Sequence, residues 1–517
     1  MSVRSKRESY NLSGSTFLVT ASGMTLKLPI PSKSNLDPLN WGQWKAAGAI
    51  CAVAWYFVAA STVVQAPSII LLGITRDFGG QDIRPWSIES VVTAPTLLIG
   101  IGALLWLPLS LALGRRPAFL IAALMMPLAS LGAGFSTSFH SLFACVCLLG
   151  LGQGFSVTSS FLMIIDLTYI HQRTRAIAAL WALLGGRQFY HYWTIPMGMA
   201  FLLAFFLYPE TYFKRPTVAF DGMILLQSAT EKLTVYKDTD TDSGLYRDLP
   251  DLPCDRYSNK SVLCGLQIAV QVSQSPVASW GAMRSCYIQM AHCLVNPLLF
   301  WVFIVSAVHW AGILFIGSSY TNVLRSPPYE LPSSLIININ TASAAGAFLA
   351  YPVGGYLTDS VLQRMAQRNR GVREAEHYLI GYIPTAVIGA GGALLYGFAV
   401  HYKLHYSLLF ISCGLEGFSW ITLCITNTLW LTEAFPRWAA PAVAVSGGAT
   451  YILSFGLGYT LVPWIKAHGF KFVGIELAVL QLVAGLVAVP VAFWGKSARQ
   501  AINGKWSSER SGALRPL

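Results

Sequence analysis

The number and spacing of the apolar stretches constrain this 517-residue chain more than any other feature. Eleven stretches are apolar and long enough to cross a bilayer, which takes about 20 residues in a helix. The chain is therefore predicted to be an all-α, polytopic membrane protein. The expected spans are 47–69, 90–112, 117–136, 141–164, 192–208, 297–318, 333–357, 379–400, 407–430, 440–463 and 473–494.

The charges of the loops call for an even number of crossings, and the mismatch falls at one span. Basic residues stand on both sides of the stretch at 192–208: Arg173, Arg175, Lys214 and Arg215. Basic loops stay in the cytosol, so the segment between them should cross twice. Residues 176–210 provide only 35 positions, too few for two crossings of about 20 each. We therefore expect the crossing before 192–208 to be absent or reduced to a stub around 176–186.

Composition narrows the class of protein further. Hydrophobic residues make up 54% of the chain and charged residues 11%, whereas a soluble domain carries about 25% charge. The net charge of +12 lies in loops between apolar spans, which is the positive-inside pattern, so we expect no nucleic-acid partner. The sequence contains neither a G-x-x-x-x-G-K-[ST] phosphate loop nor a His, Cys and carboxylate cluster with metal-ligand spacing. We expect no enzyme activity, no metal and no cofactor.

Two hydrophobic halves flank a polar interval, and they repeat one pattern. The segment LPLSLALGRRP (107–117) follows the second span of the first half, and GGYLTDSVLQRMAQRNRG (354–371) follows the second span of the later half. Such repetition is typical of secondary transporters. The expected divisions are a cytosolic segment (1–46), an N-terminal bundle (47–211), a cytosolic loop (212–294), a C-terminal bundle (295–496) and a cytosolic tail (497–517).

The polar interval itself divides into two parts. Residues 234–260 are charged and rich in turn residues, so we expect a mobile cytosolic linker. Residues 275–292 place apolar residues among polar ones, which favours a surface helix leading into the next span.

Four segments carry motifs: DPLNW at 37–41, GRRP at 114–117, DLTYIHQRTR at 166–175 and PET at 209–211. Together they resemble motifs of the major facilitator superfamily, in particular its fungal multidrug and general-substrate branch. The resemblance runs nearly end to end. It implies two pseudo-symmetric helix bundles around a central cavity.

The chain departs from the family pattern at several positions. In the first loop signature, Leu111 and Ala112 occupy the places of a carboxylate and of the following basic residue, whereas the second copy keeps Asp359. Proton antiporters of the family usually carry an arginine four residues before a glycine on the fourth helix. Here Gly150 takes the place of that arginine, and Gly154 is present.

The largest departure concerns the fifth helix. The segment GRQFY (186–190) resembles the opening of the family's sixth helix, yet almost nothing separates it from the previous motif, so about 20–25 residues are missing. The exporters' G-x-x-x-G-P-x-x-G-G signature belongs to that helix, and the chain therefore lacks this evidence for efflux. Two explanations remain open: a skipped exon or gene-model error, or a natural eleven-span protein.

Glu416 is the strongest candidate for transport chemistry, because it is the only acidic residue deep inside an expected span. A carboxylate at that depth costs several kcal/mol and persists mainly where it binds a proton or a cation. Helical spacing places Ser412, Trp420 and Asn427 on roughly the same face. We predict that Glu416 couples transport to protons; the alternative is that it only holds helices together.

Weaker candidates share a polar or aromatic side chain within a span. In the later half, Asn338 lies on one face with Ser334 and Thr341, and could contact substrate or only bridge helices. His309 is either part of the proton pathway or a helix contact, and Trp310 is a possible wall of an aromatic cavity. The candidates in the first half are Gln65 and Gln153, the latter in a stripe with Ser156 and Ser160.

Charged residues at the cytosolic ends of the spans suggest a gate. If the family fold holds, Asp166 lies near Arg115 and Arg116, as a charge lock between helices that breaks when the carrier opens inward. The alternative is a solvated end cap. Asp359 is expected to pair with Arg364 and Arg368 in the same way.

These observations predict a secondary active transporter of a small organic molecule. We expect proton coupling, alternating access and a multi-pass position in the plasma membrane of a fungus, with substrate, protons and the bilayer as partners of a monomer. One alternative is a transport-deficient product, because the loss of a crossing would invert or mispair the later half. Another is a non-transporting membrane sensor with the same fold, although the short basic tail after Trp494 argues against a signalling domain.

Overall fold

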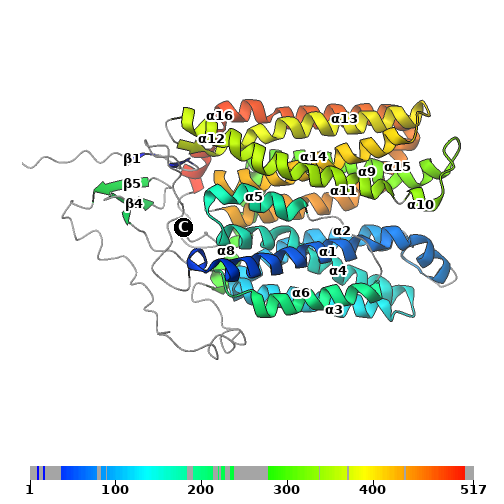
Figure 1. The fold of residues 1–517 in the computed structure, drawn as a ribbon, viewed down its shortest axis with the longest axis horizontal. Coiled ribbons are helices and arrows are strands. Elements are labelled where there is room, and N and C mark those ends of the chain that lie inside the picture. Colours follow the sequence, from blue (N-terminus) through cyan, green and yellow to red (C-terminus); the bar gives the residue numbers. More distant parts are fainter. Residues whose placement is uncertain are drawn as a thin grey trace, which may run out of the picture.

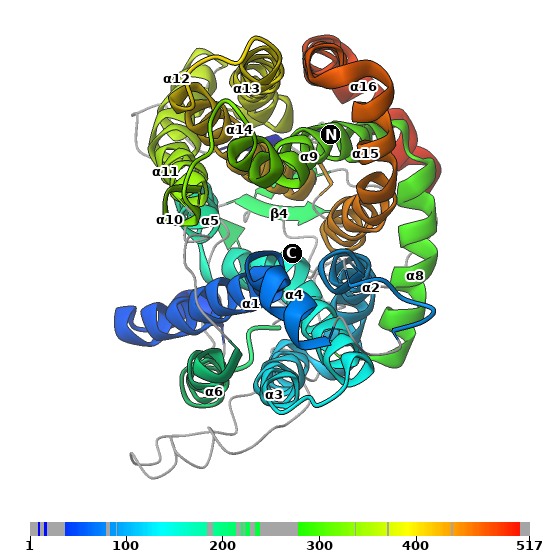
Figure 2. The ribbon, with the colours of Figure 1, turned by 90° about the vertical axis from the view of Figure 1, so that its right-hand side faces the viewer.

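The structure is a computed structural model that describes residues 9–10, 15–17, 37–78, 83–88, 90–182, 190–212, 219–220, 223–227, 233–237, 278–336, 338–369, 372–435 and 438–506. Long helices run side by side, and α1 begins at the same end of the molecule at which α16 ends (Figure 1). Seen along their axes, the helices form two groups (Figure 2). The predicted fold class, an all-α protein of two helix bundles, is confirmed.

The N-terminal bundle has an aromatic core. Its helices are α1 (Gln43–Phe78), α2 (Ser90–Leu113), α3 (Arg115–Gly134), α4 (Phe139–Leu167) and α6 (Tyr190–Leu207). The ring of Phe119 stacks on that of Phe155 with centroids 5.3 Å apart, and Tyr56 meets Phe119 edge-on at 5.2 Å. The buried Tyr56 hydroxyl donates to the carbonyl of Gly152 at 2.8 Å. Apolar rings that each find a partner, and a hydroxyl that finds an acceptor, hold α1, α3 and α4 together.

The helices of the C-terminal bundle are interrupted more often than those of the N-terminal bundle. They are α9 (Pro297–Arg325), α10 (Ser333–Ile336), α11 (Asn338–Tyr351), the π-helical turn η2 (Pro352–Leu357), α12 (Thr358–Arg368), η3 (Ala375–Gly381), α13 (Tyr382–His401), α14 (Ser407–Ala434), α15 (Ala439–Leu486) and α16 (Ala488–Trp506). Gly469 has a φ of 75°, which divides α15 into two helical parts.

Each expected span falls on a helix of the described part. By length and composition, eight of the described helical segments could cross a membrane, and Ala439–Arg499 is long enough, at 61 residues, to cross twice. The segment Thr194–Leu207 is shorter. The number of crossings therefore stays a prediction.

A 13-residue helix, α5 (Ile170–Ala182), lies where the sequence predicts a stub. At 1.5 Å per residue it is about 20 Å long, shorter than the roughly 30 Å hydrocarbon core. It follows α4 in the chain and also contacts it, so we count α5 with the N-terminal bundle. Its contacts with α11, η2 and α14 join it to the C-terminal bundle, and it lies close to α11 in the end-on view (Figure 2). Residues 183–189, which join α5 to α6, lie outside the described residues, so the loss of a full fifth crossing stays a prediction.

Short strands add a minor β component. β1 (Ser9–Tyr10), β5 (Leu233–Lys237), β4 (Met223–Gln227) and β3 (Ala219–Phe220) form one antiparallel sheet in that order, and β2 (Ser15–Phe17) pairs with β6 (Val372–Glu374). The first residues of the predicted mobile linker, 234–237, form part of strand β5 and not a turn-rich segment. They satisfy their backbone groups against β4, with Tyr236 opposite Ile224. The rest of that linker lies outside the described residues.

A surface helix, α8 (Trp280–Val295), lies where the sequence predicts one. Ser279 caps its start by accepting a hydrogen bond from the amide of Ala282 at 3.1 Å. The helix contacts α2 and α15, one from each bundle.

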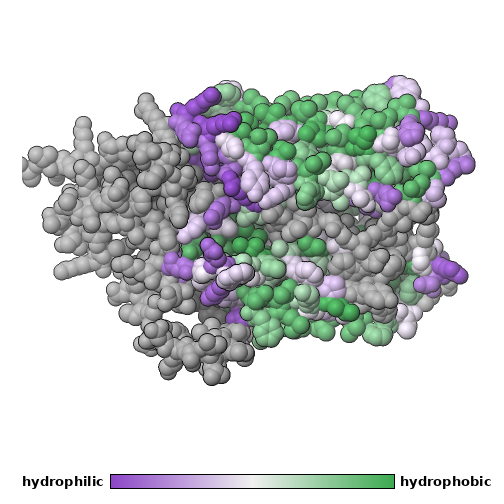
Figure 3. Space-filling model, in the orientation of Figure 1, coloured by the Kyte–Doolittle hydropathy of each residue, from purple (hydrophilic) through white to green (hydrophobic). Residues whose placement is uncertain are grey.

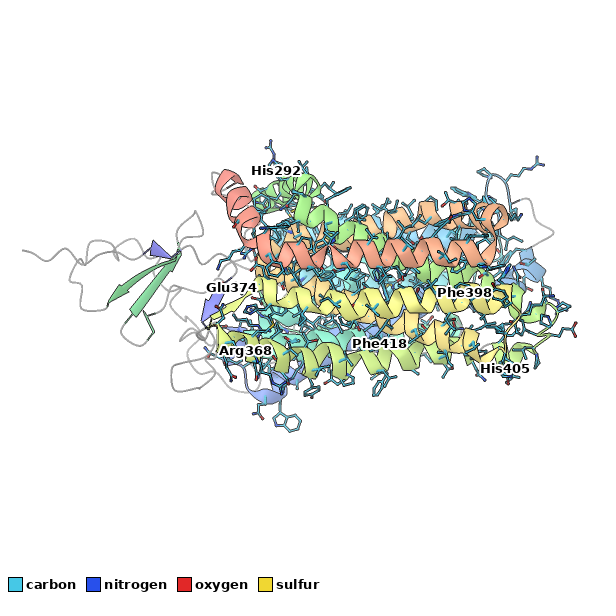
Figure 4. All side chains as sticks on the ribbon, turned by 90° about the horizontal axis from the view of Figure 1, so that it is seen from above. His292, Arg368, Glu374, Phe398, His405 and Phe418 are labelled. Atoms are coloured by element: carbon cyan, nitrogen blue, oxygen red, sulfur yellow. The ribbon has the colours of Figure 1, made fainter. Side chains whose placement is uncertain are left out.

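Hydropathy and charge orient the molecule. Apolar side chains form a belt around both bundles, and hydrophilic residues gather at the two ends (Figure 3). Arg368 and Glu374 lie at the end that carries α12, Phe398 and His405 lie towards the opposite end, and Phe418 lies between them (Figure 4). We name the end with α8 and α12 the cytosolic end, because the arginine clusters of the loops gather there.

Candidate functional site

A cavity lies between the two bundles. The lining residues come from α4 of the first bundle and from α9, α14 and α15 of the second: Val157, Phe161, Ser306, Trp420, Cys424, Asn427, Thr428, Leu431, Val443, Ser446, Gly447, Thr450 and Tyr451. None of them carries a charge. The cavity therefore offers aromatic and aliphatic surface with a few hydroxyl and amide groups, which is the usual make-up of a site for a small organic molecule.

The rings of Trp420 and Tyr451 line the cavity, and the ring of Trp310 packs behind them. The ring of Trp310 lies 4.7 Å from that of Trp420 and 5.2 Å from that of Tyr451. The indole nitrogen of Trp310 donates to the hydroxyl of Ser454 on α15. The structure thus places Trp420 on the cavity and Trp310 directly behind it, where it ties α9 to α14 and α15.

Asn427 is the polar centre of the cavity. Its amide nitrogen donates to the hydroxyl of Ser306 at 2.8 Å, and its amide oxygen accepts from the hydroxyl of Tyr382. Ser306 and Tyr382 were not among the residues singled out from the sequence. The sequence indicates only that Asn427, a polar residue inside a span, needs a polar partner. The packing of α9 and α13 on α14 shows which residues are its partners.

Glu416 does not line the cavity, although it shares a face of α14 with Trp420 and Asn427. One carboxylate oxygen accepts a hydrogen bond from the amide of Gln481 at 3.2 Å, and the residue is only 2% exposed. A Cβ at Gly312 would lie 2.7 Å from the same oxygen, so α9 also closes over it. The same face of α14 therefore has two different surroundings. Trp420 lines the cavity, whereas Glu416 points into the interior of the C-terminal bundle.

The remaining candidates lie away from the cavity lining. His309 is fully buried inside the C-terminal bundle, and its Nδ1 lies 2.9 Å from the carbonyl oxygen of Val305. Asn338 and Thr341 are exposed on α11. Gln153 is buried on α4, and its amide oxygen has no hydrogen-bond partner in the described part of the chain. The side chain of Gln65 lies outside the described residues.

The two candidate charge locks behave differently. In the N-terminal bundle, Arg115 and Asp166 form a buried ion pair at 3.0 Å, as the sequence suggests. The guanidinium of Arg116 donates to the carbonyl of Phe205 at 3.0 Å. The pair of Arg115 and Asp166 joins α3 to α4 within one bundle, so it does not by itself connect the two bundles.

The expected pairing of Asp359 with Arg364 and Arg368 is wrong. Both arginines are exposed, because positions five and nine residues further along a helix point away from Asp359 at 100° per residue. Asp359 instead accepts from Arg175 of α5 at 3.1 Å. The charge at this position therefore meets the other bundle.

A second ion pair joins α5 to the C-terminal bundle. The guanidinium of Arg173 lies 2.7 Å from the carboxylate of Glu433 at the cytosolic end of α14, and both side chains are largely buried. Arg175 also lies over the ring of Tyr356 at 4.7 Å. In the described part of the chain, α5 thus supplies both ion pairs between the bundles. The sequence marks these arginines only as a topology signal.

Glu210 of the PET motif binds three backbone amides. Its carboxylate accepts from the backbone amides of Arg115 and Arg116, each at 3.1 Å, and of Tyr212 at 2.8 Å. Burial raises the pKa of this carboxyl, although the three amides oppose the shift. Gly114, with a φ of 105°, brings the start of α3 within reach. The motif therefore fastens the end of α6 to the start of α3.

Known protein families, sequences and structures resemble this chain in sequence and in fold. The sequence profile of the Major Facilitator Superfamily matches residues 48–463. An uncharacterized MFS-type transporter of Schizosaccharomyces pombe is 22% identical over 93% of this chain and 88% of its own length. The efflux pump radE of Floropilus chiversii is 22% identical over 84% of this chain and 80% of its own. The proton:xylose symporter XylE has the same fold, with a TM-score of 0.55, 12% identity, and coverage of 90% of this chain and all of XylE.

The profile covers most of the chain, the relatives are fungal transporters, and the two bundles enclose a cavity at their interface. The chain is a multi-pass membrane transporter that belongs to the fungal branch of the Major Facilitator Superfamily.

Proposed function

We propose that this protein moves a small, uncharged, ring-containing organic molecule across the fungal plasma membrane by proton-coupled alternating access. The observation that carries the proposal is the cavity between the bundles. Its lining combines Trp420 and Tyr451 with the amide of Asn427 and carries no charge. Such a surface binds rings by stacking and hydroxyl groups by hydrogen bonds, and it would leave a charged ligand without a counter-ion.

The ion pairs of α5 support alternating access. Arg173 with Glu433 and Arg175 with Asp359 hold the cytosolic ends of the two bundles together. Opening the cavity to the cytosol has to separate these pairs. We infer that they form the cytosolic gate, and that Arg115 with Asp166 keeps the N-terminal bundle rigid while the gate moves.

Glu416 supports proton coupling. It is a fully enclosed carboxyl inside the bundle that also provides most of the cavity lining. A carboxylate in that setting persists where it binds a proton or a cation. Trp420 lies one helical turn from Glu416 and lines the cavity, so substrate and proton can influence each other through α14.

The test uses purified protein in liposomes and three fluorescent probes that differ in charge. The probes are 4-methylumbelliferyl glucoside (neutral), ethidium (cationic) and fluorescein (anionic), each followed after a pH jump across the membrane. We expect the neutral probe to accumulate most, and Trp420→Ala to lower its rate about tenfold, or about 1.4 kcal/mol. Accumulation of a charged probe alone would contradict the proposed substrate class.

The same assay addresses the short fifth helix. A variant with about 22 apolar helical residues inserted between Leu184 and Gly185 restores a full crossing. If only the lengthened variant transports, the natural-length chain is a transport-deficient product. Sequencing the transcript between the codons for Leu184 and Arg187 then shows whether an exon was skipped. If neither transports or binds any probe, the sensor alternative gains support.

A further inference from the structure

Four buried polar side chains meet inside the C-terminal bundle, away from the cavity. His309 on α9, Ser419 and Glu416 on α14, and Gln481 on α15 are each at most 2% exposed. Polar groups at such depth normally find hydrogen-bond partners, because an unpaired one costs about 1–3 kcal/mol. Their grouping therefore calls for a full account of donors and acceptors.

Glycines bring these side chains together. A Cβ at Gly389 would lie 2.5 Å from the Ser419 hydroxyl, 3.0 Å from Gln481 Oε1 and 3.3 Å from His309 Cδ2. At Gly312 it would collide with Gln481 Nε2 and lie 2.7 Å from a carboxylate oxygen of Glu416. The amide of Gln481 thus spans the group, with its nitrogen at the carboxylate and its oxygen on the side of the imidazole.

The group has more acceptors than donors. His309 Nδ1 faces the Val305 carbonyl, which only accepts, so this nitrogen carries the hydrogen and Nε2 of a neutral ring is an acceptor. The ring also interacts with the carbonyl of Thr385, which is a further acceptor. Ser419 has used its hydrogen on the Thr385 carbonyl at 2.8 Å. In the part of the chain that the structure describes, His309 Nε2, Gln481 Oε1 and one oxygen of Glu416 have no hydrogen-bond partner. All three are acceptors, so the site lacks a proton.

Rotating the Gln481 amide by 180° does not remove the shortage. The nitrogen would then serve His309, but the oxygen would face Glu416, which is an acceptor unless it is protonated. In one orientation the missing proton belongs on His309 Nε2, and in the other it belongs on Glu416. One proton lets the Gln481 amide hydrogen-bond to both ionisable side chains in either arrangement, and the second oxygen of Glu416 keeps no partner among the described residues.

We propose that Glu416, Gln481 and His309 form one site that holds a single exchangeable proton, with Gln481 as the positioning residue between the two ionisable side chains. The proton resides on a carboxylate oxygen of Glu416 or on Nε2 of His309, and the amide orientation follows it. The number of protons is the same in both forms, and emptying the site releases that one proton. This rests on the proposed coupling role of Glu416 and adds His309 and Gln481 to it.

The surroundings contain few other ionisable groups. In the described part of the chain, Cys413 of α14 itself is a titratable neighbour of Glu416, and His309 of α9 lies on the far side of the Gln481 amide. α13 presents Gly389 and Gly392, and α15 presents Gln481. The site therefore has no lysine or arginine to neutralise an emptied Glu416.

Infrared difference spectroscopy on the purified chain in lipid nanodiscs tests the site without any substrate. The carbonyl stretch of a protonated carboxylic acid is followed while the pH is raised in sodium-free buffer. We expect one titrating band that Glu416→Gln removes. Gln481→Met and His309→Gln should keep the band but move its midpoint by about one pH unit or more, a tenfold change in proton affinity.

Two pairs of glycine variants separate the site from general packing. Gly389→Ala and Gly312→Ala insert a methyl group among the three side chains and should also move the midpoint. Gly391→Ala on α13 and Gly317→Ala on α9 are matched controls, because no atom lies within 4 Å of a Cβ at either position. They should leave the spectrum unchanged.

Several results would overturn the proposal. The first is the absence of a titrating carboxyl band, and the second is a band that survives Glu416→Gln. The third is a midpoint that neither Gln481→Met nor His309→Gln moves. The fourth is loss of the band when sodium is added at constant pH, which would indicate a metal-cation site. If the spectra behave as expected but Glu416→Gln transports normally, the site exists and its coupling role fails. If Glu416→Gln uncouples transport while Gln481→Met leaves the midpoint in place, coupling stands and the three-residue site fails.

Discussion

The two bundles share a repeated design but divide the work differently. In the N-terminal bundle, rings such as Phe119 and Phe155 fill the core, and its ion pair, Arg115 with Asp166, fastens its own helices. The C-terminal bundle instead encloses Glu416 and Gln481 and provides all cavity-lining residues except Val157 and Phe161. One half has a packed aromatic core, and the other carries most of the polar groups of the cavity and encloses Glu416.

The contact between the bundles sharpens this contrast. Asp166 and Asp359 occupy the cytosolic ends of their bundles, yet the first is paired within its bundle and the second is paired with α5 of the other. The short helix α5 thus supplies both ion pairs of the proposed cytosolic gate.

Among the substitutions considered, loss of Arg173 should have the largest effect on the contact between the two bundles. Arg173→Ala leaves Glu433 buried without its partner, which costs about 3–5 kcal/mol. We expect the cytosolic ends to separate, with a shift of about two orders of magnitude towards the open form. Spin labels at Trp44→Cys and Ser360→Cys, after replacement of the native cysteines, report the distance. Arg368→Ala, at an exposed position of α12, is the control, and an unchanged distance in Arg173→Ala would exclude a gate at this pair.

Loss of Glu210 should weaken the N-terminal bundle and leave the chemistry intact. Glu210→Ala removes the acceptor of three backbone amides, and we expect a loss of about 2 kcal/mol in the free energy of unfolding. Glu210→Gln retains one oxygen and should lose less. Thermal unfolding in detergent measures both. If Glu210→Ala instead changed the pH dependence of transport at unchanged stability, the division between the bundles would be wrong.

Loss of Asn427 should affect the cavity more than the fold. Asn427→Leu removes the hydrogen-bond partner of Ser306 and of Tyr382. We expect this to lower the free energy of unfolding by about 1 kcal/mol. We expect the affinity for the neutral probe to fall about fivefold. Asn340→Leu, on the exposed side of α11, is a matched control. Equal effects of the two substitutions would show that Asn427 does not contact the substrate.

Loss of Arg175 should have the smallest effect. Its side chain is 49% exposed, so solvent screens its end of the pair, and the buried Asp359 keeps a hydrogen bond from Gln363 at 3.4 Å. Arg175→Ala should therefore cost about 1 kcal/mol in the free energy of unfolding. The cytosolic opening measured with the same spin labels should change little, and raising the salt concentration should reduce the difference further. An effect as large as that of Arg173→Ala would show that the two pairs act as one unit.

Periodicity and charge predict the fold well, because spans and basic loops are local features of the sequence. The same local reading identifies Glu416 as a buried carboxyl, and the short helix α5 lies near the predicted stub, although the loss of a full crossing stays a prediction. It fails where the partner comes from elsewhere in the chain. Gln481 lies 65 positions from Glu416, and Arg175 lies 184 positions from Asp359. Nothing in the spacing of α14 or α12 indicates those contacts.

The pairing of Asp359 with its neighbours shows the same limit at short range. Arg364 and Arg368 are close to it in sequence but lie on the opposite side of α12. Likewise, the common face of Glu416, Trp420 and Asn427 is real, yet α14 meets the cavity at one level and the bundle interior at another. Helical geometry predicts the direction of a side chain, whereas packing decides what it meets.

Accumulation of 4-methylumbelliferyl glucoside by Glu416→Gln proteoliposomes after a pH jump tests the central claim most directly. The amide mimics the protonated acid and does not titrate. We predict that accumulation driven by the pH gradient is lost, that exchange of the probe without net proton movement survives, and that Glu416→Asp keeps part of the activity. Accumulation by Glu416→Gln at the parental rate, with unchanged pH dependence, would contradict the claim that the C-terminal bundle carries the coupling proton.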